Sequence, residues 1–125
     1  MEQITFVYTT QPEAMWRFYG DTLGLGLTFE KGGCRIYRVT PNSYIGVCHR
    51  ADREVHPKGV CLSFVAHEVD GWYQRLNDAG IPTDGPPRET EAYGIYHFFA
   101  YDPEGHAVEF QRFTDPAWPG AREVL

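Results

Sequence analysis

An imidazole and a carboxylate, His97 and Glu109, lie on either side of a turn in the last third of the chain. Such a pair can act as an acid and a base when the two groups are held within reach of each other and of a substrate. The thiol of Cys61 is a further candidate, either as a nucleophile or as a soft metal ligand. If the protein is an enzyme, we expect His97 and Glu109 to be its catalytic residues.

The turn that must bring these side chains together is residues 102–105, Asp-Pro-Glu-Gly. Pro at the second position and Gly at the fourth are typical of a type I turn closed by a left-handed residue, which predicts a hairpin with a bulged loop. In that register Phe99 lies opposite Glu109, and opposed residues share a face. One face of the hairpin then carries His97, Phe99, Tyr101, Glu109 and Gln111, and the other carries Phe98, Ala100, Val108 and Phe110.

A pattern of one strand, one helix and three strands occurs twice in the chain. In the first half, strands at 3–9, 27–30, 34–39 and 44–49 accompany a helix that begins near Pro12 and ends before Gly24. In the second half, a strand at 59–66, a helix at 69–79 and a weak edge strand within 81–90 precede the hairpin. We expect each half to form a small sheet with a helix on one side and an uncovered face on the other.

The net charge and the cysteines indicate which kinds of binding partner and which cellular location to expect. The formal net charge of −6 argues against nucleic acid as a partner. No stretch is long and apolar enough to span a membrane, and the first residues lack the pattern of a signal peptide. The three cysteines are odd in number and far apart in sequence, so we expect no disulfide framework, no CxxC metal site and a cytoplasmic location.

Three motifs, at residues 17–25, 64–81 and 99–110, together resemble the vicinal oxygen chelate superfamily. That superfamily contains glyoxalase I, the bleomycin- and fosfomycin-resistance proteins, methylmalonyl-CoA epimerase and the extradiol dioxygenases. The resemblance implies an α+β fold in which two βαβββ modules form an eight-stranded cup around a ligand. It also implies a single glyoxalase-like domain over residues 1–125, with module one at about 1–50, a linker at 51–58, module two at about 59–113 and a C-terminal tail at 114–125.

In the metal enzymes of this superfamily, the ligands come from the first and last strands of each module. The corresponding positions here hold Ile4, Gly46, Cys61 and Glu109, with Thr5 and Val60 as alternatives one residue away. A catalytic divalent metal needs about three protein ligands, and one carboxylate with one thiolate is too few and mismatched in softness. We therefore expect no metal and no other cofactor.

Two classes of function stay open. The first is a metal-free, homodimeric binding protein of the bleomycin-resistance type that holds a small aromatic or cationic molecule. Its candidate ligand-binding residues are Phe6, Tyr8, Tyr37, Cys61, Phe99 and Tyr101, beside His97 and Glu109. The second is an enzyme of the same superfamily (a lyase, an isomerase or epimerase, or a dioxygenase) that uses Glu109 and His97 as an acid–base pair or holds a divalent metal. A segment with Arg88, Glu89, Glu91 and Tyr93 is expected to form the rim and to set specificity.

Overall fold

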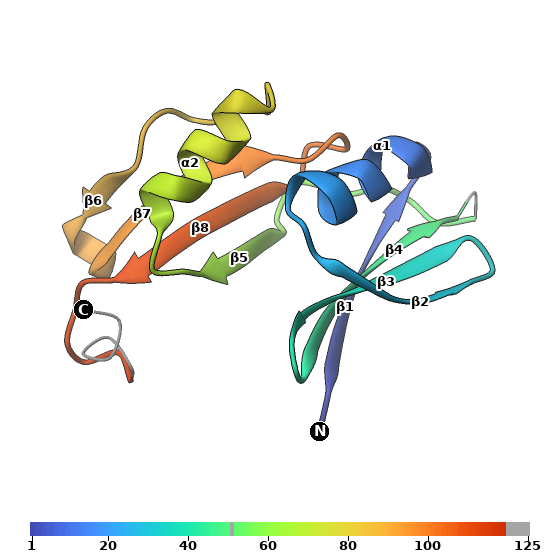
Figure 1. Ribbon diagram of the computed structural model, residues 1–125, viewed down its shortest axis with the longest axis horizontal. Coiled ribbons are helices and arrows are strands. Elements are labelled where there is room, and N and C mark those ends of the chain that lie inside the picture. Colours follow the sequence, from blue (N-terminus) through green and yellow to red (C-terminus); the bar gives the residue numbers. More distant parts are fainter. Residues whose placement is uncertain (51, 120–125) are drawn as a thin grey trace. The chain divides into compact units, whose positions relative to one another are not determined.

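The computed structural model describes residues 1–50 and 52–119, and the chain divides into two compact units, Met1–Pro57 and Lys58–Leu125 (Figure 1). Unit 1 contains β1 (Gln3–Thr9), α1 (Pro12–Trp16), η1 (Arg17–Thr22), β2 (Gly26–Lys31), β3 (Cys34–Thr40) and β4 (Ser43–His49). Unit 2 contains β5 (Cys61–Val65), α2 (Val69–Asp78), β6 (Arg88–Thr90), η2 (Glu91–Tyr93), β7 (Ile95–Tyr101) and β8 (Ala107–Phe113). None of the helices in the described residues is long and apolar enough to cross a membrane.

Both units have the same sheet topology. The strand order is β1-β4-β3-β2 in unit 1 and β5-β8-β7-β6 in unit 2. β1 pairs in parallel with β4, and β5 pairs in parallel with β8. The remaining neighbours pair antiparallel. This repeated order confirms the predicted α+β fold with two βαβββ modules, whereas the closed eight-stranded cup stays a prediction.

In unit 1 the helical segment covers one face of the sheet. Pro12 occupies the first turn of α1, where its missing N–H costs no hydrogen bond, and the segment continues through the wider turn η1 to Leu23. Gly24 follows with a positive φ of 76°, which ends the helix as the sequence predicts. Met15, Phe18 and Tyr19 on the inner side are almost fully buried.

In unit 2 the helix α2 covers one face of the sheet, and aromatic rings form the core between them. Phe110 on β8 stacks on Trp72 of α2 at 4.8 Å between ring centroids and on Phe98 of β7 at 5.5 Å. Leu76 of α2 is completely buried. These contacts use the apolar side of the hairpin, so its polar side is left on the other face of the sheet.

A disulfide bond joins Cys34 on β3 to Cys48 on β4. The expectation that the cysteines form no disulfide is therefore wrong. The two residues are 14 apart in sequence, but the β3–β4 hairpin places them directly opposite each other, with a Cα–Cα distance of 4.0 Å. The cytoplasmic location was inferred from the absence of disulfides, so this bond removes that argument.

Candidate functional site

The face of the unit 2 sheet that α2 does not cover carries the polar side chains of the hairpin, and we call it the helix-free face. Strand pairing puts Phe99 opposite Glu109 and His97 opposite Gln111, as the turn predicts. The parallel neighbour β5 adds Ser63, which lies opposite Glu109, and the edge strand β6 adds Arg88 opposite His97. The predicted sharing of one face by His97, Phe99, Tyr101, Glu109 and Gln111 is confirmed by this register.

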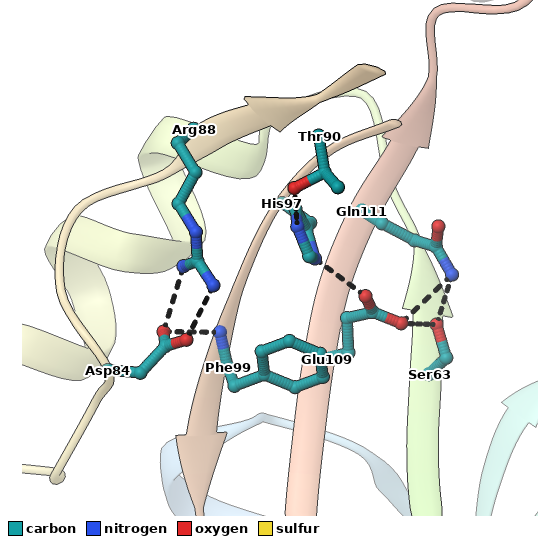
Figure 2. A network of polar contacts seen from close by, with 8 residues as sticks. All are labelled: Ser63, Asp84, Arg88, Thr90, His97, Phe99, Glu109 and Gln111. Atoms are coloured by element: carbon teal, nitrogen blue, oxygen red, sulfur yellow. Dashed lines mark hydrogen bonds and ion pairs between the residues drawn. The ribbon is translucent and has the colours of Figure 1, made fainter. Parts of the chain in front are cut away.

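The carboxylate of Glu109 is held by three protein donors (Figure 2). Its Oε2 lies 2.8 Å from Nδ1 of His97, and its Oε1 accepts hydrogen bonds from the Ser63 hydroxyl at 2.9 Å and the Gln111 amide at 3.1 Å. Glu109 is only 8% exposed. Burial of a carboxylate is costly unless hydrogen bonds compensate it, and here both oxygens are used.

His97 connects this carboxylate to a hydroxyl group. Its Nδ1 contacts Glu109, and its Nε2 lies 2.8 Å from Oγ1 of Thr90 on β6 (Figure 2). The imidazole is buried, with 5% exposure, and its edge packs against the ring of Phe99 at 5.3 Å between centroids. Both nitrogens of the ring are therefore engaged, and Glu109, His97 and Thr90 are joined by two consecutive hydrogen bonds.

An arginine–aspartate pair lies beside these three hydrogen-bonded residues. Arg88 donates two hydrogen bonds to the Asp84 carboxylate, at 3.1 and 2.7 Å, and Asp84 also accepts one from the Phe99 backbone N–H at 2.9 Å. Burial acts to raise the pKa of Asp84, but these hydrogen bonds outweigh it and the pKa lies below its usual value. The Arg88 guanidinium also lies 6.0 Å from the Phe99 ring, so a fixed cation borders the aromatic part of the face.

Cys61 is a free cysteine on the same face, but it does not face the carboxylate directly. Its register partner on β8 is Ala107, two residues before Glu109. Desolvation of the thiol and the negative charge of Glu109 raise the pKa of Cys61. The side chain therefore stays a thiol at neutral pH, which makes it a poor nucleophile.

The aromatic residues expected from unit 1 fall on opposite faces of its sheet. Phe6 and Tyr8 line a surface pocket of about 280 Å³ together with Arg50 and the two bonded cysteines. Tyr37, by contrast, is 2% exposed, and its hydroxyl donates a hydrogen bond to the Trp16 carbonyl oxygen below the helical segment. The prediction that Tyr37 shares a ligand-binding surface with Phe6 and Tyr8 is therefore wrong, because alternate residues of β3 point to opposite faces.

The positions that would hold a metal in this fold do not fit one here. Ile4 offers no donor atom, and a side chain at Gly46 would begin 2.5 Å from the Phe6 ring that covers it. Cys61 and Glu109 together supply only two ligands of mismatched softness, and the oxygens of Glu109 already have protein partners. Within residues 1–50 and 52–119 there is no group of three or more His, Cys, Asp or Glu side chains that could hold a metal ion.

Ser63, Thr90 and Asp84 belong to the site, and the sequence did not single them out. Ser63 interrupts an otherwise apolar strand, and this polar residue in the run Cys-Leu-Ser-Phe-Val is the signal that could have identified it. Thr90 and Asp84 come from the Pro-rich stretch before the hairpin, for which we expected at best a weak edge strand. That edge strand exists as β6, and Arg88 and Glu89 lie on it rather than in a loop.

Comparison with known proteins agrees with this architecture. Residues 2–110 match the family model described as Glyoxalase/Bleomycin resistance protein/Dioxygenase superfamily. Similar solved structures include lactoylglutathione lyase from Agrobacterium tumefaciens (TM-score 0.73, 23% identity, covering 90% of this chain and 92% of that one). They also include a glyoxalase/bleomycin resistance protein/dioxygenase from Nocardioides (TM-score 0.73, 20% identity, 96% and 87%) and the oxidase ChaP-H2 (TM-score 0.70, 21% identity, 90% and 92%). At these identities the likeness concerns the fold, and no curated protein sequence matches this chain significantly.

Proposed function

The chain belongs to the glyoxalase/bleomycin resistance protein/dioxygenase superfamily, and we propose that within it this protein binds a small planar aromatic molecule without a metal. The observation that carries the proposal is the state of Glu109. Its two carboxylate oxygens are occupied by His97, Ser63 and Gln111. A carboxylate held in this way is a structural part of a binding surface rather than an open ligand for a cation.

Each unit has its own aromatic rings available for stacking. On the helix-free face of unit 2, Phe99 is half-buried and Tyr101 is 37% exposed. On unit 1, Phe6 is 47% exposed and lines the pocket with Tyr8. Aromatic faces of this kind favour planar ligands, which stack on the rings or meet them edge to face.

The site chemistry also indicates whether the ligand carries a positive charge. We expected a cationic group as an alternative to an aromatic one, with Glu109 as its partner. Because its two oxygens are engaged by three donors and the residue is only 8% exposed, Glu109 is poorly placed to contact a cation directly. We therefore propose that aromatic surface rather than positive charge decides affinity.

A panel of planar dyes tests this proposal. Anilinonaphthalene sulfonate, acridine orange and flavone differ in charge but share a flat aromatic system, and their binding can be followed by calorimetry and by the fluorescence of Trp16, Trp72 and Trp118. We expect saturable binding of at least one of them. Loss of one aromatic contact is worth about 0.5–1.5 kcal/mol, so Tyr101→Ala should weaken binding by a factor of about 2 to 13.

Tyr96→Ala provides the matched control, because Tyr96 lies on the other face of β7 and its hydroxyl donates a hydrogen bond to Asp70 of α2. Its affinity should equal that of the unchanged protein. Phe6→Ala shows whether the unit 1 pocket takes part. If no dye in the panel binds saturably, or if Tyr96→Ala weakens binding as much as Tyr101→Ala, the proposal is wrong.

An enzyme of the same superfamily is the second candidate, and the 2.8 Å contact between His97 and Glu109 favours it. Named structural neighbours include a lyase and an oxidase. Direct proton abstraction by Glu109 is hindered because its oxygens are engaged, and a divalent metal does not fit the residues present. The homodimer and the cytoplasmic location stay predictions.

A further inference from the structure

Two buried histidine–carboxylate pairs belong to the β7–β8 hairpin, and the His97–Glu109 pair is in contact with the hydroxyl group of a threonine. His106 Nδ1 lies 2.8 Å from Asp102 at the turn, with both residues about 5% exposed. His97 Nδ1 lies 2.8 Å from Glu109 in the middle of the strands. The contacts of His106 in the described part of the chain are with Asp102, whereas His97 contacts Thr90 Oγ1 through its other nitrogen at 2.8 Å.

The direction of the hydrogen bonds between Thr90, His97 and Glu109 follows from which of these groups can donate a proton. A carboxylate only accepts, so Nδ1 of His97 must carry the proton that it donates to Glu109. In the neutral ring Nε2 then has a lone pair and no proton, so the Thr90 hydroxyl must be the donor. On the other side, Gln111 donates to Ser63 and Ser63 donates to Glu109, which fixes the carboxylate in place (Figure 2).

This order of a hydroxyl, an imidazole and a carboxylate is the arrangement that activates a hydroxyl nucleophile. We propose that the Thr90 hydroxyl, activated by His97 and Glu109, is a nucleophile that accepts an acyl group from a small activated ester. The inference adds an activity to the proposed binding function and does not depend on the identity of the bound molecule.

Thr90 is placed where a small substrate can reach it. It lies on β6, the edge strand of the sheet, and is partly exposed, whereas His97 and Glu109 are buried. Phe99 packs against the edge of the His97 ring, so an aromatic leaving group has an apolar surface close to the imidazole. These features favour esters of phenols over esters of long aliphatic alcohols.

In the acylation step, Thr90 Oγ1 forms a bond to the carbonyl carbon and the bond from that carbon to the phenolic oxygen breaks. The hydroxyl proton passes to Nε2 of His97 and from there to the departing phenolate. In the second step a water molecule gives a proton to Nε2 of His97 and attacks the acyl carbon. The bond from that carbon to Thr90 Oγ1 breaks, the carboxylic acid leaves, and Oγ1 takes the proton back from Nε2. Glu109 stabilises the imidazolium in both steps and accepts no proton itself.

Acylation by p-nitrophenyl acetate tests the proposal, with p-nitrophenol release followed by absorbance and the acetyl group located by peptide mass spectrometry. Thr40 is an internal control, because its hydroxyl is exposed and contacts only the Ser43 hydroxyl and a backbone N–H among described groups. General-base assistance contributes about 10²- to 10⁴-fold, so Thr90 should be acetylated at least 100-fold faster than Thr40. Neutral hydroxylamine distinguishes a thioester on Cys61 from an oxygen ester on Thr90.

His97→Gln removes the general base and should lower the rate of Thr90 acetylation at least 100-fold, to about the rate of Thr40. His106→Gln, which disrupts the other buried pair, should leave that rate within twofold. Thr90→Ser should retain acetylation at this position, and thermal unfolding of each variant reports whether it is folded. Acetylation confined to other residues, or an equal rate in His97→Gln, would overturn the proposal.

Discussion

Replacing Glu109 with alanine is expected to destabilise the protein by about 3–5 kcal/mol, because it leaves buried donors without their acceptor. His97 would lose its 2.8 Å partner, and Ser63 and Gln111 would lose theirs. Glu109→Gln should cost less, about 1–3 kcal/mol. The amide keeps one oxygen for the Ser63 side but places an N–H opposite Nδ1 of His97.

Guanidinium denaturation followed by circular dichroism measures these losses. Glu89→Ala is the matched control, since Glu89 is an exposed carboxylate on β6. Exposed substitutions of this kind change stability by less than about 0.5 kcal/mol. If Glu109→Ala is as stable as Glu89→Ala, the carboxylate is not held as described.

Replacing Phe110 with alanine should cost a similar amount, about 3–5 kcal/mol, because the ring lies at the centre of the unit 2 core. Phe110 is 1% exposed and stacks on Phe64 at 5.3 Å, on Trp72 at 4.8 Å and on Phe98 at 5.5 Å. Its removal leaves a cavity among rings from two strands and the helix. The same denaturation experiment, with near-ultraviolet dichroism as the readout of aromatic packing, should show a lower midpoint.

Phe113→Ala is the comparison on the same strand. Phe113 is only half-buried, and its ring stacks on Trp118 in the C-terminal segment at 3.9 Å. Loss of this outer contact should cost about 1 kcal/mol. Equal losses for Phe110→Ala and Phe113→Ala would contradict the location of the core between α2 and the sheet.

The hairpin and its two faces could be predicted because local chemistry decides them. The Asp-Pro-Glu-Gly turn fixes which residues of β7 and β8 oppose each other, so the pairing of Phe99 with Glu109 follows from the sequence alone. The helices could be predicted for the same reason, since Pro12 and the glycines after them mark their ends.

What the sequence could not provide is the register between strands distant in the chain. Ser63 reaches Glu109 only because β5 pairs in parallel with β8, and no turn connects these strands to set that register. Thr90 reaches His97 through an edge strand of three residues in a Pro-rich stretch. Tyr37 was misplaced because the faces of β3 depend on which of its alternating residues the helical segment of unit 1 covers. The disulfide, by contrast, lies within the β3–β4 hairpin, whose register places the two cysteines opposite each other.

The central claim is that Glu109 is satisfied by its protein partners and is not a metal ligand. Calorimetric titration of the metal-stripped protein with Ni²⁺, Zn²⁺ and Mn²⁺, repeated with Glu109→Gln, tests it most directly. We predict that no ion binds at a stoichiometry of one per chain with micromolar affinity, and that the two proteins give the same result. Binding of one ion per chain that disappears in Glu109→Gln would contradict the account.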